Sequence, residues 1–474
     1  MLTERFKSMF REYDVRGMVC DEELCDENVA IIANAFSLFL TKRNINRVIV
    51  GYDNRVYSEK FYEIVIETLT GNGLEVIAVG LTLSPVVYFS QYHYNCPGAI
   101  MITASHNPDG WSGFKLSAGF SATLNKAEID ELYALCDFGG KKPDIRGSVQ
   151  YINVRDAYID NIVSRIKLDR ECVPKLVIDA GNGGAGVFAY EIFQRIGCMV
   201  FQLNCDPDYT YPHYFPNPSD LTARKQLRSM VLHPYIKADI GISFDGDGDR
   251  IGVLNEKGND VWADKLLLLL SKQLLGKKKG AKIVFDVKCT QALTEFISGN
   301  GGVPLVSETG HSYIKARMKS EGADLGGERS GHIYIGGDEY WGFDDALFAA
   351  AKIVEFVSNE NKPISEIINE FPHYHTTSEI SANCPDSEKY NVVKRFASDL
   401  KSMFPQNKTT EINGIKMFFD AGWGLVRASS NMPALSIVFE AKTRSSLENI
   451  YNLFHGILSN YPEIDSNWGN VTIN

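Results

Sequence analysis

Three aspartates at alternating positions are the most distinctive chemical feature of the chain. The segment ISFDGDGDR (242–250) places Asp245, Asp247 and Asp249 after an apolar run that predicts a buried strand. Alternate side chains of an extended backbone point to the same face, and the intervening glycines let the chain curl, so the three carboxylates can converge. Converging carboxylate oxygens are typical ligands of hard cations, and three of them together with a phosphate oxygen suit Mg²⁺.

A serine at the end of another predicted strand offers a group that can carry phosphate. The apolar segment PGAIMI (97–102) runs into TASHNP (103–108), so Ser105 is expected at a strand end beside His106, where Pro108 prevents an immediate helix. The surroundings lack the Gly-x-Ser-x-Gly turn of serine hydrolases. A serine that accepts phosphate needs a nearby cation to neutralise charge, and the three aspartates would bind one. Together the two motifs predict phosphoryl transfer.

Further motifs follow along the chain. The segments FREYDVRG (10–17), GERSGH (327–332) and GWGLVRAS (422–429) flank or follow TASHNP and FDGDGDR. In this order, the motifs resemble the signatures of the α-D-phosphohexomutase family, in its phosphomannomutase/phosphoglucomutase branch. The resemblance covers essentially the whole chain.

This resemblance implies an enzyme that reversibly converts hexose 1-phosphates and hexose 6-phosphates through a phosphoserine and a 1,6-bisphosphate intermediate. Phosphomannomutase, with phosphoglucomutase activity beside it, is the expected reaction, and its products would supply nucleotide sugars. The resemblance implies Ser105 as the phosphorylated residue and as a ligand of one Mg²⁺ per chain, together with Asp245, Asp247 and Asp249. It also implies a hexose 1,6-bisphosphate as activator. Phosphoglucosamine mutase, and a sugar-phosphate-binding paralogue with little turnover, remain as alternatives.

Positions that match the family's cleft-lining residues define the rest of the expected site. Arg16 and Lys115 would stabilise charge or manage protons near the serine. His332 is the candidate base for the sugar hydroxyl, because an imidazole titrates near neutral pH. Glu328 and Ser330, two residues apart in an extended segment, would hold the sugar's 3- and 4-hydroxyls and leave the 2-position unread. The remaining expected substrate contacts are Tyr13, His106, Arg250, Lys288, His311, Arg427, Ser429, Ser430 and Asn431.

The expected phosphate loop departs from the family pattern. Residues 427–433 offer a guanidinium and several short donors in one loop, which is typical of an oxyanion site. Ser430 stands where the family usually has Asn, and Asn431 stands where it usually has Thr. All of these side chains donate hydrogen bonds, so phosphate binding is expected to survive. Arg329 stands where the phosphoglucosamine branch commonly has Gln, which favours a sugar without an amino group.

Two patterns permit other interpretations. GNGGAG (181–186), with Asp206 further on, matches the dinucleotide-binding fingerprint, but irregular sequence follows Asp206 and the same loop is a family feature, so we expect a structural turn. The three aspartates also fall at the first, third and fifth positions of an EF-hand loop, with Glu256 at its twelfth. Arg250 occupies the sixth position, where that loop needs Gly, and the flanks are strand-like, so calcium sensing is disfavoured.

Composition excludes several classes of function. With 48 basic and 59 acidic residues the net charge is −11, which disfavours sequence-independent binding to nucleic acid and to anionic membranes. Nine cysteines without a Cys-x-x-Cys pair indicate reduced thiols, and no signal peptide or membrane span is predicted, so we expect a cytoplasmic protein. The expected partners are small-molecule sugar phosphates, and the expected state is a monomer or weak homodimer.

The elements that position these motifs predict four domains in a chain of 474 residues. Strand-like runs at 47–53, 176–181 and 281–286 precede Gly-containing loops and helical patterns, which is typical of βαβ units. After Tyr374 the pattern changes to α+β, with hairpin-like strands at 377–381, 415–420 and 434–440. The expected fold class is therefore α/β: three similar α/β domains (1–150, 151–256 and 257–371) and a smaller α+β C-terminal domain (372–474) around a central cleft.

Overall fold

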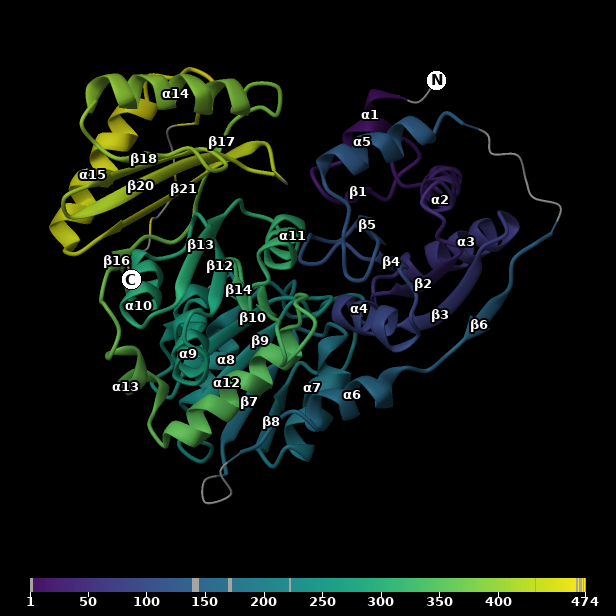
Figure 1. Ribbon diagram of the computed structural model, residues 1–474, viewed down its shortest axis with the longest axis horizontal. Coiled ribbons are helices and arrows are strands. Elements are labelled where there is room, and N and C mark those ends of the chain that lie inside the picture. The colour runs from purple at the N-terminus through teal and green to yellow at the C-terminus, as the bar shows by residue number, and fades with distance from the viewer. Residues whose placement is uncertain are drawn as a thin grey trace.

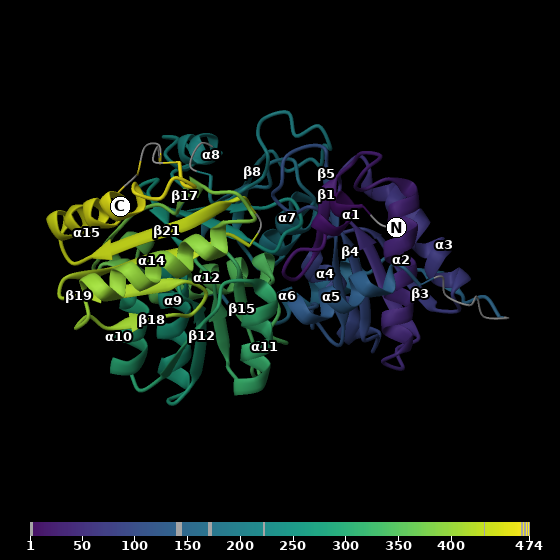
Figure 2. The same ribbon diagram turned by 90° about the horizontal axis from the view of Figure 1, so that it is seen from above.

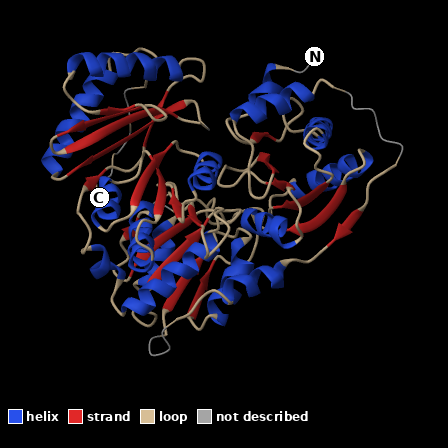
Figure 3. Cartoon of the chain, viewed as in Figure 1, coloured by secondary structure: helices blue, strands red, loops and turns tan. Residues whose placement is uncertain are grey.

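The computed structural model describes residues 3–138, 145–168, 173–220, 223–430, 432–465, 468, 471 and 473. Within these residues, four sheets follow one another along the chain, each with helices packed against it (Figure 1, Figure 3). The first domain and the C-terminal domain lie at opposite ends of the long axis (Figure 1, Figure 2). The arrangement confirms the expected fold class of three α/β domains and a further α+β domain.

The first three sheets share one design, in which parallel strands run from one edge through the centre and antiparallel pairing closes the other edge. The first sheet has the order β1-β5-β4-β2-β3-β6. Its strands are β1 (Val15–Met18), β2 (Arg47–Tyr52), β3 (Glu75–Leu81), β4 (Gly98–Ile102), β5 (Trp111–Ala118) and β6 (Val149–Tyr151), and its helices are α1 (Glu4–Ser8), α2 (Asp26–Thr41), α3 (Ser58–Gly71), α4 (Ser84–His93) and α5 (Lys126–Leu135).

The second and third sheets have the orders β11-β10-β9-β7-β8 and β13-β12-β14-β15. The second unit contains α6 (Arg155–Val163), β7 (Lys175–Asp179), α7 (Ala185–Arg195), β8 (Met199–Leu203), α8 (Arg224–Val231), β9 (Ile240–Phe244), β10 (Ile251–Asn255) and β11 (Asp260–Val261). The third contains α9 (Ala263–Lys277), β12 (Lys282–Asp286), α10 (Gln291–Gly299), β13 (Val303–Ser307), α11 (His311–Glu321), β14 (Leu325–Gly327), β15 (Ile333–Ile335), α12 (Ala346–Glu360) and α13 (Ile364–Ile368).

The C-terminal sheet is antiparallel throughout, with the order β16-β21-β20-β19-β18 and β17 also paired to β21. It has a separate core, whereas one continuous apolar cluster joins the first three domains. A small cluster around Trp423 and Val287 packs it against the third domain. Its elements are β16 (His375–Thr376), β17 (Ile380–Asn383), α14 (Lys389–Met403), β18 (Thr409–Thr410), β19 (Ile415–Phe419), β20 (Gly422–Ala428), β21 (Ala434–Ala441) and α15 (Arg444–Leu458).

The expected strands are largely confirmed. The three βαβ runs correspond to β2, β7 and β12, and the strand before the serine corresponds to β4. The strand expected at 377–381 begins only at Ile380, because the preceding residues make the turn between β16 and β17. The domain boundaries at 150, 256 and 371 stay predictions. Among the described helices, none combines the length and hydrophobicity that a bilayer crossing requires.

Asp345 ties the second domain to the third and yields a pH-dependent prediction. Its carboxylate accepts hydrogen bonds from Phe348 N at 2.9 Å, Tyr158 OH at 2.8 Å and Tyr340 OH at 2.9 Å. Burial raises the pKa of Asp345 to about 6, although these three donors lower it. An aspartate whose folded pKa lies above its unfolded value of about 4 loses stability as the pH rises from the unfolded pKa to the folded pKa. The full cost is present above the folded pKa, and none remains well below the unfolded pKa.

Asp345→Asn is therefore expected to stabilise the protein by about 2 kcal/mol at pH 7.5 and to give no gain at pH 4, because asparagine caps helices as well as aspartate and carries no charge. The measurement is the thermal unfolding midpoint of both proteins at the two pH values. Asp156→Asn is the control, since the Asp156 side chain is 80% exposed. An equal gain at both pH values would contradict the assigned pKa.

Candidate functional site

The predicted phosphoryl-carrying serine lies on a tight loop after β4. Ser105 is buried and has a φ of +50°, a left-handed conformation that costs a non-glycine residue roughly 1–2 kcal/mol. Its backbone N donates to Thr103 Oγ1 at 2.8 Å, and its Oγ donates to Asp245 Oδ2 at 2.9 Å. Gly246 lets the two loops meet, because a Cβ there would lie 2.9 Å from the Ser105 carbonyl oxygen. The serine hydroxyl is thus held against the aspartate cluster.

The three aspartates converge, as expected, but on a turn instead of an extended strand. Asp245 Oδ1 accepts hydrogen bonds from the backbone N of Asp249 and of Arg250, each at 3.0 Å, and this folds the segment between β9 and β10 back on itself. Gly248 provides the required positive φ of +72°. One oxygen of each carboxylate lies within 4.8 Å of the others, and all three residues are fully buried.

The cluster fits a bound cation. Within the described residues, Asp247 Oδ1 and Asp249 Oδ1 are buried without a hydrogen-bond partner. A buried carboxylate oxygen without a donor is costly unless a cation neutralises it. Burial raises the pKa of Asp245, and the neighbouring Asp249 and Asp247 carboxylates raise it further, so the cluster favours added positive charge. A metal ion held by these oxygens would give the two unpaired carboxylate oxygens a partner and would neutralise part of the negative charge of the cluster.

Lys115 supplies one positive charge beside the cluster. It lies on β5, and its Nζ donates to Asp247 Oδ2 at 2.6 Å and also to Asp249. Burial lowers the pKa of Lys115, but the Asp247 and Asp249 carboxylates outweigh this effect and hold the pKa well above its usual value. Burial raises the pKa of the Asp249 carboxyl, but the nearby Lys115 and His332 outweigh this effect and lower the pKa to about 2. Lys115 is therefore an ammonium ion paired to the two carboxylates.

A cavity of about 410 Å³ gathers most of the other expected residues from all four domains. Six expected residues do not line the cavity and are buried next to it: Ser105, Arg16, Lys115 and the three aspartates. His106 connects the two parts, because it lines the cavity and its Nδ1 lies 3.1 Å from Ser105 Oγ. The expected residues that line the cavity are Tyr13, His106, Arg250, Lys288, His311, Glu328, Ser330, His332, Arg427, Ser429 and Ser430.

Residues near the serine are firmly held. Arg16 donates to Asn107 Oδ1 at 2.7 Å and to Asp14 Oδ2 at 2.6 Å, so its guanidinium braces the serine loop. Burial lowers the pKa of His106 well below its usual value, and the cations Arg250 and Arg16 lower it further. His106 is therefore a neutral imidazole beside the serine oxygen.

The segment expected to bind the sugar is also a turn, whereas an extended conformation was expected. Gly331 N donates to the Glu328 carbonyl at 3.1 Å, and Glu328 N donates to the His332 carbonyl at 2.9 Å. Glu328 and Ser330 nevertheless both line the cavity. Glu328 already accepts hydrogen bonds from Gly310 N and Tyr334 OH, both at 2.7 Å, which fix its carboxylate while each oxygen keeps a free lone pair for a sugar hydroxyl.

Aromatic contacts position two further cavity residues. The rings of Tyr13 and His311 pack edge to face, with centroids 4.6 Å apart. His311 Nδ1 lies 3.3 Å from Thr123 Oγ1, and its Nε2 is buried without a partner among the described residues. Burial lowers the pKa of His311 well below its usual value. His311 is therefore a neutral group with one unused nitrogen.

The expected phosphate loop is split between a strand and a turn. Arg427 lies on β20 and not in the loop as expected, while Ser429 and Ser430 follow the strand. The Arg427 guanidinium donates to Ser430 Oγ at 2.9 Å and to Asn413 Oδ1. Asn431 lies outside the described residues. The hydroxyl of Ser430, at the position that departs from the family pattern, thus orients the arginine.

Lys288 reaches the cavity paired to an acid that the sequence analysis missed. Its Nζ donates to Glu379 Oε2 at 2.9 Å, and Glu379 also accepts from Ser436 Oγ. Burial alone raises the pKa of Glu379, but Lys288 and Ser436 lower it to about 2. Glu379 precedes β17, at the junction of the third and fourth domains. The pair therefore joins the walls that the third and fourth domains contribute to the cavity.

Arg55 is a second residue that was missed, and it clamps the serine loop. Its guanidinium donates to four backbone carbonyls in or beside that loop, and Asp53 Oδ2 lies 3.4 Å from its Nε. The only sequence signal is its place just beyond β2, at the same sheet edge as the serine. The accepting carbonyls belong to Ser105 (2.9 Å), Asn107 (2.6 Å), Pro108 (3.0 Å) and Trp111 (3.2 Å).

Arg55→Lys is expected to reduce kcat about 10- to 100-fold, because an ammonium cannot satisfy four carbonyls spread around a planar guanidinium and the left-handed serine then loses its support. The thermal midpoint should fall as well, since buried carbonyls are left unpaired. The control is Arg43→Lys, because Arg43 makes a partly exposed ion pair with Glu131. A normal kcat together with a lowered midpoint would restrict Arg55 to a role in stability.

The glycine-rich segment at 181–186 serves packing. A Cβ at Gly186 would lie 2.1 Å from the Cys205 carbonyl oxygen, and a Cβ at Gly183 would lie 3.1 Å from the Cα of Gly246. Asn54 Nδ2 of the first domain donates to the Asn182 carbonyl at 2.9 Å. Gly183 and Gly186 therefore permit close packing within the second domain, and the Asn54 hydrogen bond links this loop to the first domain.

Known proteins are similar to this chain in sequence and in architecture. Family models described as phosphoglucomutase/phosphomannomutase, alpha/beta/alpha domains I, II and III, match residues 7–140, 156–258 and 262–374. The chain is 36% identical over 459 residues to a phosphomannomutase/phosphoglucomutase of Pseudomonas syringae, covering 97% of each. It is 35% identical over 462 residues to a phosphoglucomutase of Neisseria gonorrhoeae, covering 97% of this chain and 98% of that one.

A solved structure extends the comparison to three dimensions. The phosphoglucomutase/phosphomannomutase family protein of Burkholderia thailandensis is 30% identical, with a TM-score of 0.88 over 98% of this chain and 99% of that one. Similarity over nearly the full length confirms the family that the motifs resemble. The chain therefore belongs to the α-D-phosphohexomutases, in the phosphoglucomutase/phosphomannomutase group.

Proposed function

We propose that the chain is a phosphomannomutase with phosphoglucomutase activity, which interconverts hexose 1-phosphates and hexose 6-phosphates through phosphorylated Ser105 and a 1,6-bisphosphate. One observation carries the proposal: Ser105 Oγ lies 2.9 Å from Asp245 in a fully buried cluster of three carboxylates, and it adjoins, through His106, a cavity that Arg427 also lines. A serine between a cation site and a phosphate clamp suits transfer of phosphate to and from a bound sugar.

Ser105 and Asp245, Asp247 and Asp249 would hold one Mg²⁺, whose charge would counter that of the transferring phosphoryl group. Mg²⁺ is the ion of choice because the ligands are compact carboxylate oxygens together with a phosphate. Lys115 keeps Asp247 and Asp249 ionised and oriented. Arg16 brings guanidinium charge to the serine loop and Arg250 brings it to within 3.9 Å of Asp245, so both would stabilise the negative charge that develops during transfer.

The substrate would lie across the cavity with its reacting hydroxyl toward Ser105 and its phosphate toward Arg427 and Ser429. Glu328 and Ser330 would hold hydroxyls of the ring, and Tyr13, His311 and Lys288 would complete the walls. After the first transfer the sugar carries two phosphates. It must then turn over, so that the phosphate clamp holds the newly bound phosphate and the original phosphate faces the serine. A hexose 1,6-bisphosphate would therefore also prime the unphosphorylated enzyme.

Mannose and glucose phosphates are both proposed as substrates, because the expected ring contacts leave the 2-position unread. Arg329 supports a sugar without an amino group, and its guanidinium is fully engaged in the protein, donating to Thr376 Oγ1 at 3.0 Å and to the Thr377 carbonyl at 2.6 Å. The cytoplasmic location, the monomeric or weakly dimeric state and the role in nucleotide-sugar supply stay predictions.

Phosphorus NMR tests the proposal. The protein is mixed with Mg²⁺ and a trace of glucose 1,6-bisphosphate, and mannose 1-phosphate, glucose 1-phosphate and glucosamine 1-phosphate are added in separate tubes. Conversion of the first two to 6-phosphates supports a dual-specificity mutase, and their rate ratio gives the preferred sugar. Fast conversion of glucosamine 1-phosphate alone would replace the proposed substrate. A lack of conversion in every tube would favour a sugar-phosphate-binding paralogue and would overturn the proposal.

A further inference from the structure

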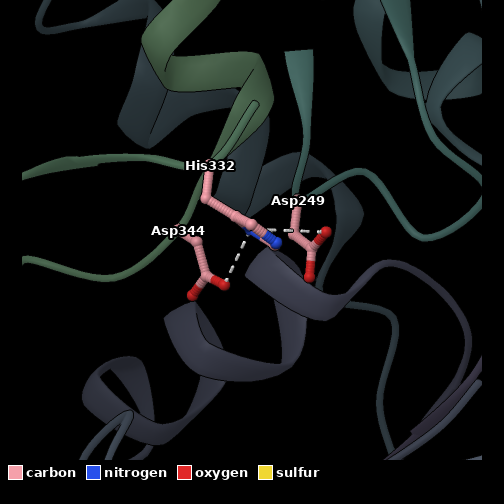
Figure 4. A group of neighbouring side chains, drawn as sticks. All are labelled: Asp249, His332 and Asp344. Carbon is pink, nitrogen blue, oxygen red and sulfur yellow. Dashed lines mark ion pairs between the residues drawn. The ribbon is translucent and has the colours of Figure 1, made fainter. Parts of the chain in front are cut away.

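The imidazole of His332 faces carboxylates from two different domains (Figure 4). Its Nδ1 lies 3.3 Å from Asp344 Oδ2 and 3.7 Å from Asp249 Oδ1. Asp344 immediately precedes the Asp345 cap of α12. It stands opposite Tyr334 of β15 in an isolated antiparallel bridge. This bridge holds the Asp344 carboxylate alongside the turn that carries the histidine.

Asp344 is the better matched of the two partners for Nδ1. In the part of the chain that the structure describes, His332 Nδ1 and Asp344 Oδ2 are both buried and neither makes a hydrogen bond of full geometry. At a separation of 3.3 Å, a small rotation of the ring lets a protonated Nδ1 donate a hydrogen bond to Asp344 Oδ2, which gives both atoms a partner. Asp249 Oδ1 lies farther from Nδ1, at 3.7 Å, and belongs to the aspartate cluster that would hold the cation.

The far side of Asp344 is fixed by a buried cation. Lys315 of α11 donates to Asp344 Oδ1 at 3.2 Å, and its ammonium lies 4.2 Å from the centroid of the Tyr88 ring. Asp344 is fully buried, and Lys315 is 6% exposed. A carboxylate held at both ends has little freedom to rotate, so it can impose one orientation on the ring that binds to it.

We propose that Asp344 is a positioning residue for phosphoryl transfer: it binds the Nδ1–H of His332 and leaves the bare Nε2 facing the cavity, where it takes the proton of the attacking sugar hydroxyl. The inference rests on the proposed mutase function. The tautomer of a histidine is set by the partner of its other nitrogen, and a base needs an unprotonated nitrogen directed at the proton it removes.

The proton balance closes on His332 over one catalytic cycle. In the first transfer the sugar hydroxyl loses its proton to Nε2, its oxygen bonds to phosphorus, and the bond from phosphorus to Ser105 Oγ breaks with its electron pair on the seryl oxygen. In the second transfer that oxygen bonds to the phosphorus at the other end of the sugar. The bond from phosphorus to the sugar oxygen breaks, and the sugar oxygen takes back the proton from Nε2.

A double-mutant cycle tests whether Asp344 acts through His332. Asp344→Asn is expected to lower kcat about 10- to 100-fold and to change KM less than about threefold, because the amide supports the wrong tautomer but touches no substrate. In the His332→Ala background the same change should lower kcat by less than about twofold. Equal fold losses in both backgrounds, with thermal midpoints near that of the wild type, would overturn the proposal.

A measurement on the unaltered protein covers the case in which Asp344→Asn fails to fold. Long-range proton–nitrogen NMR of histidine-labelled protein reports which ring nitrogen carries the proton, and His332→Gln assigns the signal. The expected form has the proton on Nδ1, and a proton on Nε2 alone would overturn the proposal. Mutase assays of the wild type are run beside it, so that a failure of the proposed function is seen separately from a failure of this inference.

Discussion

Ser105→Ala is expected to lower kcat at least about 1,000-fold while the fold is retained, because it removes the oxygen that carries the phosphoryl group. Ser105 Oγ is the serine atom in contact with Asp245, at 2.9 Å. Ser84 Oγ also touches the cluster, at 2.6 Å from Asp247 Oδ2, but it already accepts from Lys115 Nζ at 3.2 Å. Ser105, in contrast, is joined to the cavity through His106, which lines it and lies 3.1 Å from Ser105 Oγ. We therefore expect no other hydroxyl to replace Ser105.

The loss is measured in two ways. Turnover of glucose 1-phosphate and mannose 1-phosphate gives kcat, and intact mass after incubation with glucose 1,6-bisphosphate shows whether one phosphoryl group has been added. Ser112→Ala is the matched control, because Ser112 lies on the adjacent β5, is fully buried and is expected to leave labelling intact. If Ser105→Ala kept a kcat within tenfold of the wild type, or still gained a phosphoryl group, the phosphoserine assignment would be wrong.

Sequence patterns predicted the strands well because burial and length constrain them strongly. The run before the serine is apolar at every position, and all five residues of β4 are buried. All five residues of β9, which precedes the aspartates, are buried as well, and only Ser243 among them is polar. Strands that are covered on both faces are continuous apolar runs, and Gly, Pro and Asp mark where they end. The fold class followed from the order of such runs along the chain.

The two site segments that were expected to be extended are turns, and the reason is physical. A period of two describes a strand, but it also describes a glycine-rich turn whose polar residues alternate with glycines. Whether such a segment forms a strand or a turn depends on hydrogen bonds that the spacing of residue types does not reveal. Asp245 accepts two backbone N–H groups of its own turn, and Glu328 accepts Gly310 N from a neighbouring loop. These contacts fold the segments while keeping the functional side chains together.

The residues that were missed act through contacts between distant parts of the sequence. Arg55 lies 50 residues from Ser105, whose carbonyl it holds, and Lys288 lies 91 residues from Glu379. A single arginine or glutamate is usually solvent-exposed, so residue type alone gives no reason to place it in a site. Family motifs pointed to side chains that are expected to meet the substrate, but they did not point to the groups that hold those side chains in place.

Asp245→Asn is expected to remove the response to Mg²⁺ and to lower kcat about 100-fold or more, because one of three anionic oxygen ligands is lost. It should not destabilise the metal-free protein. Burial and two neighbouring carboxylates raise the pKa of Asp245, so its charge is unfavourable when no cation is bound. The amide oxygen can still accept from Asp249 N and Arg250 N, which preserves the turn.

Thermal unfolding with EDTA and across a Mg²⁺ titration separates these two effects. The wild-type midpoint should rise with Mg²⁺, because a ligand that binds only the folded state stabilises it by mass action. The midpoint of Asp245→Asn should stay flat and begin at or above the wild-type value in EDTA. Asp239→Asn is the control, since Asp239 is exposed just before β9, at the end away from the cluster, and should respond as the wild type does. If the unfolding midpoint of Asp245→Asn still rose with Mg²⁺, the cation would bind elsewhere. If Asp245→Asn were much less stable than the wild type in EDTA, the negative charge of Asp245 would stabilise the turn, and its repulsion by the neighbouring carboxylates would be the smaller effect.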